Sequence, residues 1–224
     1  AHVFPSVIGV IARDHSFNAC VTTLVDVGSA GADNFEEFKE IIDKTPARVL
    51  VFLNISPPGM GKGENDPHTF DVERAVETAK KHPDLIVGIK TAHYGGGNYD
   101  DGVSTPWLAI DRALAAGKKA NLPVMIDTSS RPQIGDYPAR TYSELILKKM
   151  RPGDIHTHCY AGHFPVIMDD GKVNPDILKA QKSGRIFDIG HGSGSFVFRN
   201  AVLLYICPIP CRNSSLWGYR LRMS

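Results

Sequence analysis

Polar side chains interrupt the apolar segments of this chain at the points where strands are expected to end. Six such residues follow one another along the sequence: Asp26, Asn54, Lys90, Asp127, His158 and Asp188. The carboxyl ends of the strands of a parallel barrel converge on one mouth, so these side chains should lie close together there. A lysine, a histidine and several carboxylates in one place can bind a metal ion or transfer protons. Asp26, Asn54 and Asp188 have a plainer alternative, in which each caps a loop by bonding to nearby backbone.

Lys90 and His158 carry most of this argument. Lys90 ends the apolar segment 85–90 (LIVGIK), and a buried lysine is costly unless it is paired or functional. His158 follows His156 by two positions, so strand alternation predicts that both rings face the same side. A single histidine in a core would be ordinary, whereas two at a strand end are typical of metal binding or proton transfer. Asp127 interrupts its own apolar segment in the same way as Lys90.

Several further residues fall on loops that are expected at the mouth. His93, Tyr94 and Arg131 are candidates for binding a carboxylate or an acyl group, although Arg131 could equally be a solvated surface residue. The glycine-rich segment 190–195 (GHGSGS) permits close approach of a ligand, but it is neither a nucleophile elbow nor a strong phosphate loop. His191 within this segment is a candidate for substrate binding and for proton transfer, and so a candidate catalytic residue.

The elements that must position these residues alternate between short apolar strands and amphipathic helices. Strands are expected at 21–27, 48–55, 85–90, 124–127, 154–158 and 185–189. Helices are expected between them, at 34–44, 71–81, 107–120, 141–150 and 176–182. This order predicts an α/β fold in which helices cover a parallel sheet. The sequence lacks the early Gly-x-Gly-x-x-Gly turn of a dinucleotide fold, so a TIM-type (β/α)8 barrel is favoured over a doubly wound sheet.

The length of the chain limits how much of such a barrel it can form. A complete barrel takes about 250 residues, and this chain has 224. We therefore expect a barrel that is incomplete at both ends, formed by residues 1–202 and followed by an atypical tail, residues 203–224. An incomplete barrel has open strand edges, from which we expect either association, as in a homo-oligomer, or instability.

Composition narrows the class of partner. The chain is 42% hydrophobic and 22% charged with a net charge of +1, so charge gives no reason to expect a nucleic-acid or membrane partner. No apolar segment is long enough for a membrane-spanning helix. The four cysteines lack the spacing of a disulfide framework, which favours reduced thiols and a cytoplasmic location. The expected partner is a small-molecule substrate.

Four segments in combination resemble the amidohydrolase superfamily, in its amidohydrolase/deacetylase branch of dihydroorotase-like metallohydrolases. They are 21–31 (VTTLVDVGSAG), 87–94 (VGIKTAHY), 151–160 (RPGDIHTHCY) and 187–192 (FDIGHG). The resemblance covers about residues 2–200, and it is specific only because the segments occur together.

The resemblance implies a (β/α)8 barrel with one or two metal ions, typically zinc, and a carboxylated Lys90 that bridges them. His158 matches the sixth-strand histidine ligand, and His2 matches the second half of the first-strand His-x-His pair. Asp127 occupies the fifth-strand ligand position, where many relatives have histidine. The implied activity is hydrolysis of an amide, cyclic amide or ester bond of a small molecule by metal-activated hydroxide.

The chain departs from the family pattern at both ends. The first histidine of the His-x-His pair does not precede His2, and the eighth-strand Ser-Thr-Asp segment does not occur in residues 203–224. We therefore expect a tail that is out of frame with its ancestral sequence, or a fragment, with the general acid–base aspartate lost. Two other functions stay open: a catalytically incomplete barrel that only binds a ligand or partner, and a Schiff-base aldolase that uses Lys90.

Overall fold

The computed structural model describes residues 2–4, 9–94, 101–105, 107–127, 142–162, 164–190 and 195–206. Within these ranges six strands form one parallel sheet, in the order in which they occur along the chain. They are β1 (Thr23–Val27), β2 (Arg48–Asn54), β3 (Ile86–Lys90), β4 (Val124–Ile126), β5 (Ile155–His156) and β6 (Ile186–Phe187). A doubly wound sheet would reverse direction and place later strands on both sides of the first. The observed order therefore confirms the barrel-type winding that the sequence predicts.

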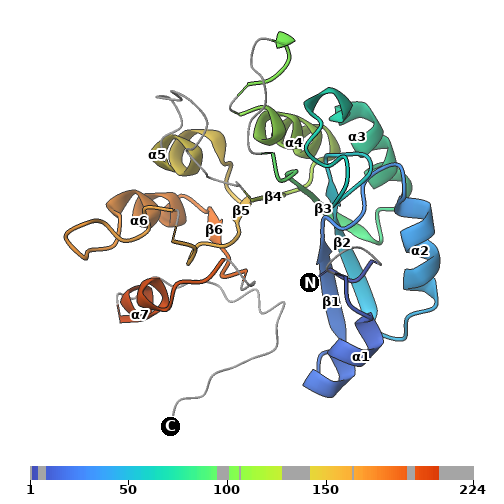
Figure 1. Ribbon diagram of the computed structural model, residues 1–224, viewed down its shortest axis with the longest axis horizontal. Helices are drawn as coiled ribbons and strands as arrows, with labels where there is room; N and C mark the ends of the chain where they lie inside the picture. The colour runs from blue at the N-terminus through green and yellow to red at the C-terminus, as the bar shows by residue number, and fades with distance from the viewer. Residues whose placement is uncertain are drawn as a thin grey trace.

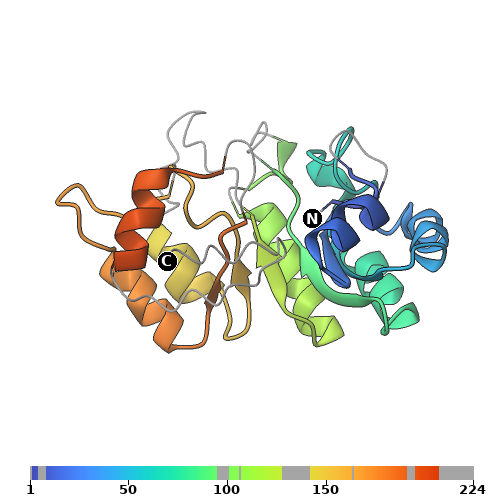
Figure 2. The same ribbon diagram turned by 90° about the horizontal axis from the view of Figure 1, so that it is seen from below.

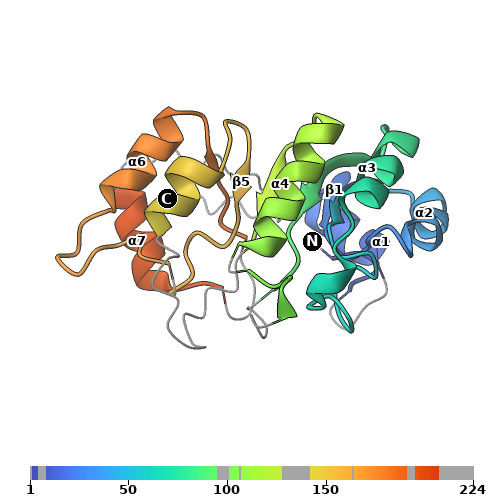
Figure 3. The ribbon, with the colours of Figure 1, turned by 90° about the horizontal axis from the view of Figure 1, so that it is seen from above.

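The sheet curls into a half-barrel, and the helices follow one another along its outer side (Figure 1). The main ones are α2 (Phe35–Asp43), α3 (Val72–Lys81), α4 (Leu108–Ala120), α5 (Tyr142–Glu144) with the π-helical turn Leu145–Lys149, α6 (Pro175–Lys182) and α7 (Phe198–Ile206). The short α1 (Ala12–Ser16) lies at the β1 end of the arc, and α7 lies at the opposite end (Figures 1 and 2). Seen from above, α4 lies between α3 on the α2 side of the arc and α6 on the α7 side (Figure 3).

Local sequence explains where two of these helices begin. The carboxylate of Asp71 accepts a hydrogen bond from the backbone N–H of Arg74 at 3.1 Å, which caps the first turn of α3. Asn174 caps α6 in a similar way, and Pro175 takes the first helical position, where its missing N–H costs nothing. Each of these helices then turns an apolar stripe towards the sheet, as its sequence period predicts.

The last two strands are shorter than the sequence predicts, with two residues each in place of the segments 154–158 and 185–189. After β5 the backbone of His158 adopts a left-handed φ of 58°, which ends the strand. The same turn breaks the alternation that was expected to put His156 and His158 on one side. His156 is instead fully buried, and its ring lies between those of Phe164 and Phe187.

Helix α7 extends into the segment that the sequence sets apart as an atypical tail. Residues 203–206 belong to this helix, so the expected boundary after residue 202 falls inside it, and residues 207–224 lie outside the described ranges. The helix escapes sequence reasoning because its apolar residues are not confined to one face. Phe198 is 75% exposed and Val202 is 37% exposed, while Ala201 packs against the core.

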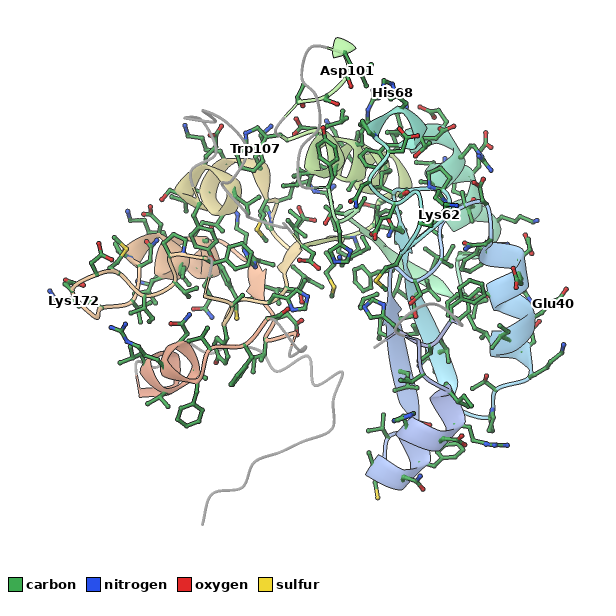
Figure 4. The ribbon with its side chains drawn as sticks, in the orientation of Figure 1. Glu40, Lys62, His68, Asp101, Trp107 and Lys172 are labelled. Atoms are coloured by element: carbon green, nitrogen blue, oxygen red, sulfur yellow. The ribbon has the colours of Figure 1, made fainter. Side chains whose placement is uncertain are left out.

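The hydrophobic core lies between the sheet and its helices. Its largest fully buried side chains are Phe35, Phe38, Leu53, Ile55, Ile86, Ile89, Met125, Ile126, Ile146, Met150 and Ile177. Charged side chains such as Glu40 and Lys172 point away from the arc on its outer side (Figure 4). No helix in the described ranges is long and apolar enough to cross a membrane.

The amino-terminal ends of β4 and β5 are joined by a buried aspartate. Asp154, which precedes β5 and is 1% exposed, accepts a hydrogen bond from the backbone N–H of Val124 at 2.9 Å. It also accepts from the guanidinium and the backbone N–H of Arg151. This network ties the start of β4 to β5 at the end of the sheet opposite to Lys90, so its role is structural.

Close packing between β2 and β3 depends on the absence of a side chain at Gly88. Gly88 pairs with Phe52, where the register of the two strands shifts, and the Phe52 ring lies over the Gly88 backbone. A Cβ atom at position 88 would stand 2.1 Å from Cε1 of Phe52, far inside van der Waals contact. The two residues therefore form a size-matched pair.

We expect Gly88→Ala to lower the free energy of unfolding by about 1–3 kcal/mol, because the added methyl group forces the Phe52 ring out of its position. Urea unfolding measures this change. Gly88→Ala should lower the free energy of unfolding by less in a chain that already carries Phe52→Leu than in the wild-type chain. A double-mutant cycle measures this difference. An additive double mutant would mean that the two side chains do not collide.

Candidate active site

Lys90 and Asp127 form a buried ion pair at the carboxyl edge of the sheet. Lys90 is the last residue of β3, and Asp127 directly follows the neighbouring strand β4. The Nζ atom of Lys90 lies 3.2 Å from Oδ2 of Asp127, and the two side chains are 3% and 8% exposed. Thr91 fixes the backbone of Asp127, because its hydroxyl accepts from the Asp127 N–H at 2.9 Å and donates to the Asp127 carbonyl at 3.0 Å. The buried lysine therefore has the partner that its burial requires.

Asp127 is the centre of a larger cluster. Besides Lys90, its Oδ2 atom meets Nε2 of His93 at 2.8 Å and Nε2 of His158 at 3.3 Å. Burial by itself would raise the pKa of Asp127, but the charge of Lys90 and the hydrogen bonds from His158 and His93 outweigh burial and hold this pKa well below its usual range. Asp127 is thus an anion at neutral pH, with three nitrogen atoms around one oxygen.

His93 joins Asp127 to a second carboxylate, that of Glu64. Its Nδ1 atom lies 3.1 and 3.2 Å from the two carboxylate oxygens of Glu64, and its backbone N–H donates to Oε1 at 3.1 Å. The charge of Lys90 and burial both lower the pKa of His93, but the hydrogen bonds to Asp127 and Glu64 prevail and raise it to about 9. His93 is therefore an imidazolium held between two carboxylates.

Glu64 is a site residue that sequence reasoning missed. It lies in the loop between β2 and α3, ten residues beyond the strand end at Asn54. No local pattern marks it, since it stands among glycines in a loop that reads as solvated. The nearest residue that the sequence does single out is Asn54, and in the structure its Nδ2 atom donates to Oε1 of Glu64 at 2.9 Å.

His158 is oriented by the glycine that follows β6. Its Nδ1 atom donates a hydrogen bond to the carbonyl oxygen of Gly190. A Cβ atom at position 190 would lie 2.2 Å from Oγ1 of Thr157 and 2.8 Å from Nδ1 of His158, so only glycine allows this approach. The sequence suggested that glycine here makes room for a ligand. In the structure Gly190 makes room for His158, which itself holds a left-handed φ that side chains rarely adopt.

The segment that begins with His2 lies against the end of β1. The backbone N–H of Val3 donates to Oδ2 of Asp26 at 2.8 Å, and Oδ1 of Asp26 accepts from the N–H of Ser29. Asp26 therefore bonds to backbone, as in its plainer alternative. Nδ1 of His2 lies 2.9 Å from the Ser29 hydroxyl, and burial, together with nearby charges that include Lys90, lowers the pKa of His2 to about 3. The ring is neutral at physiological pH, which is the state that binds metal.

Asn54 and Asp188 also bond to protein groups rather than projecting freely into the mouth. Besides Glu64, Asn54 donates to the carbonyl of Gly28 at 3.0 Å. Asp188 accepts from the hydroxyl of Thr157 at 2.8 Å. Both residues are buried, and both support neighbouring strand ends.

Three residues predicted on mouth loops have other outcomes. Tyr94, predicted to bind substrate, is 4% exposed and belongs to the core, where its ring meets that of Phe70 edge-on at 5.7 Å. The chain turns inward directly after His93, which no feature of the sequence indicates. Arg131 and His191 lie outside the described residues, so their predicted roles in substrate binding and catalysis stay predictions.

The donor atoms around Asp127 suit a metal ion in their chemistry. Because Nδ1 of His158 donates to a carbonyl, its Nε2 atom is the ring nitrogen that a metal ion would take, and it faces Asp127 Oδ2 at 3.3 Å. Ligands about 2.0–2.1 Å from a tetrahedral zinc ion stand at about this separation from each other. In the described part of the chain no three His, Cys, Asp or Glu side chains are arranged as a metal site.

Solvent reaches only some members of this cluster. The side chains of His93 and His158 are 35% and 25% exposed, whereas those of Lys90, Glu64 and Asp127 are all at or below 8%. The two histidines are thus the members of the cluster that a small molecule from solvent could contact.

Deacetylases from three bacteria resemble the chain in sequence, whereas no protein-family model matches it. The deacetylase of Brucella anthropi is 35% identical over 190 residues, that of Agrobacterium fabrum 34% over 190, and that of Enterococcus faecalis 30% over 185. Each match covers 81% of this chain but only 44%, 43% and 47% of the relative, respectively. The chain therefore spans less than half the length of these proteins.

Two solved structures resemble the half-barrel. An adenine deaminase superimposes with a TM-score of 0.76 over 90% of this chain and 53% of its own, and its 24% identity speaks for the fold alone. A dihydroorotase superimposes with a TM-score of 0.65 at 29% identity, over 84% of this chain and 50% of its own. Likeness to the deacetylases in sequence and to the dihydroorotase in both sequence and structure shows that this chain belongs to the amidohydrolase superfamily.

Proposed function

We propose that this chain forms the metal-binding part of a hydrolase that cleaves an amide, cyclic amide or ester bond in a small molecule. The observation that carries the proposal is the meeting of Lys90, His93 and His158 on one buried oxygen of Asp127, all within 3.3 Å. Lys90 ends β3 and His93 follows it, while Asp127 and His158 follow β4 and β5. All lie at the carboxyl ends of consecutive strands, the edge at which barrel enzymes carry out their chemistry.

His2, Lys90, Asp127 and His158 would hold the metal. Their nitrogen and oxygen donors suit zinc, and one or two such ions would activate water and polarise the carbonyl group of a substrate. Carboxylation of Lys90 would turn a buried cation into an anion with two oxygens, and so remove its repulsion of a divalent ion. The neutral ring of His2 and the orientation of His158 by Gly190 support these assignments.

The chain's own side chains would also bind and orient the substrate. His93 and His158 are the exposed members of the cluster, so a small molecule that enters the mouth meets their rings first. The Nε2–H group of His93 points at Asp127 and could donate in addition to a carbonyl or carboxylate oxygen of the substrate. Arg131 and His191 complete the set of substrate-binding and catalytic candidates on sequence grounds.

Removal of an acetyl group is the narrower activity that we favour. Its support is the name deacetylase, which the similar proteins of Enterococcus faecalis, Brucella anthropi and Agrobacterium fabrum carry. Small N-acetyl and O-acetyl compounds are therefore the first substrates to test.

The two competing functions make different demands on Lys90. A Schiff-base aldolase needs a free amine as nucleophile, whereas the amine of Lys90 is engaged by Asp127 and by the carbonyl of Thr91 at 3.3 Å. Borohydride trapping with a carbonyl substrate tests this function directly. A barrel that only binds ligand would take up zinc without turnover.

Our first functional prediction concerns Lys90→Met, which keeps the length of the side chain but cannot be carboxylated. After supplementation with zinc and bicarbonate, the wild-type chain should bind zinc and release acetate from small acetylated compounds. The variant should lose more than about 100-fold of this activity, the upper end of the losses seen for outer partners of metal ligands. Lys172→Met, at an exposed position on the outer side of the arc, is the matched control and should behave as the wild type (Figure 4).

Metal analysis accompanies this assay. Failure of the wild-type chain to bind zinc under these conditions would remove the basis of the proposal. Zinc binding without hydrolysis of any acetylated compound would instead favour the barrel that only binds ligand.

Our second functional prediction concerns Asp127→Asn. This change leaves Lys90 buried without its counter-charge, and we expect the free energy of unfolding of zinc-free protein to fall by about 3–5 kcal/mol. The folded pKa of Asp127 is lowered, so its stabilising effect is present above the usual aspartate pKa of about 3.9 and is lost as pH falls below it. Urea unfolding between neutral and acid pH measures this effect. Asp111→Asn removes the exposed partner of Lys149 and should cost at most about 1 kcal/mol.

A further inference from the structure

Glu64 is the one buried carboxylate of the cluster that the proposed ligand set does not use. Its side chain is 5% exposed, and both of its oxygens have hydrogen-bond donors. Oε1 accepts from Asn54 Nδ2 at 2.9 Å and from the backbone N–H of His93 at 3.1 Å, and Nδ1 of His93 lies within 3.2 Å of both oxygens. Glu64 thus joins the end of β2 to the residues that follow β3.

The ring of His93 has little freedom between its two partners. Nδ1 of His93 lies within 3.2 Å of both oxygens of Glu64, and its Nε2 atom lies 2.8 Å from Oδ2 of Asp127, so the ring bridges the two carboxylates. Rotation of the ring would break the bond to Glu64 and the bond to Asp127 together. The position of one carboxylate is therefore transmitted to the other through a single rigid ring.

The loop that carries Glu64 has other supports. The backbone N–H of Gly59 donates to the carbonyl of Ser56 at 2.9 Å, and that of Met60 donates to Ser29 at 3.1 Å. His68 and Asp101 point towards each other from the loops after β2 and β3, with Nε2 and Oδ2 3.5 Å apart (Figure 4). The Glu64 carboxylate is therefore not the sole tie that shapes these loops, and its contact with His93 calls for another explanation.

We propose that Glu64 is a positioning residue, which fixes the ring of His93 and thereby holds the carboxylate of Asp127 towards Lys90 and His158. This inference rests on the proposed function, in which Asp127 is a metal ligand. Outer partners of metal ligands orient them, and their loss typically costs about 10–100-fold in metal affinity or activity. Glu64 would act on Asp127 through two successive hydrogen bonds, with the ring of His93 between them.

The test compares Glu64→Gln with the wild-type 224-residue chain. Glutamine keeps the size of the side chain and an acceptor for Asn54, but its amide group cannot accept from Nδ1 of His93 at both atoms. We expect zinc binding in the presence of bicarbonate to weaken by about 10-fold or more, as measured by calorimetry. We also expect kcat for acetate release to fall with little change in KM, because Glu64 does not reach the substrate. Glu73→Gln is the matched control, since Glu73 is an exposed carboxylate on α3 that pairs with Lys119.

A second readout separates this inference from the proposed function. In zinc-free protein with ¹⁵N-labelled histidine, the ring signals of His93, assigned with His93→Gln, should move in Glu64→Gln and stay in place in Glu73→Gln. If wild-type protein binds zinc and Glu64→Gln binds it equally well, the positioning role is wrong and the proposed function stands. If wild-type protein binds no zinc, the proposed function fails and the ring signals of His93 alone test the inference. Movement of these signals in Glu64→Gln supports the positioning of His93 by Glu64, and unchanged signals overturn it.

Discussion

The rest of this half-barrel has to accommodate one buried carboxylate, that of Asp127, which is surrounded by nitrogen atoms. Lys90 and Asp127 are almost out of contact with water, and either charge alone would be strongly unfavourable there. The hydroxyl of Thr91 holds the backbone of Asp127, and Gly190 leaves space for the ring of His158. Apolar residues of similar volume would stabilise a sheet edge at least as well as such an ion pair does. The cluster is therefore better explained by chemistry than by stability.

The winding of the sheet is what brings this cluster together. Strands β3, β4 and β5 are neighbours in space as well as in sequence, and Lys90 pairs in register with Met125, while Ile126 pairs with His156. Asp127 and His158 then follow the last paired residue of their strands by one or two positions. Three consecutive units of strand and helix thus supply the lysine, the aspartate and the histidine, and the outer helices hold those units in place (Figure 1).

The sequence predicts those features of the structure that follow from the period of its apolar residues. The apolar segments predict the six strands of the described sheet, and the polar residues at their ends predict that Lys90, Asp127 and His158 lie close together, as they do. Three features were beyond its reach. Glu64 meets His93 across 29 positions of sequence that include α3 and β3, a separation that no local pattern encodes. The inward turn that buries Tyr94 against Phe70 and the left-handed backbone of His158 both arise from tertiary packing, which overrides local preference.

The charges of the cluster give a reason why metal binding and carboxylation would occur together. Lys90 and the imidazolium of His93 carry positive charge, and Asp127 and Glu64 carry an equal negative charge, so these four groups are balanced without metal. A divalent ion would add two positive charges to a site that is nearly closed to water, where an imbalance is costly. Carboxylation changes Lys90 from a cation to an anion, a change of two charges in the opposite direction. One modified lysine would therefore offset the charge of one divalent ion.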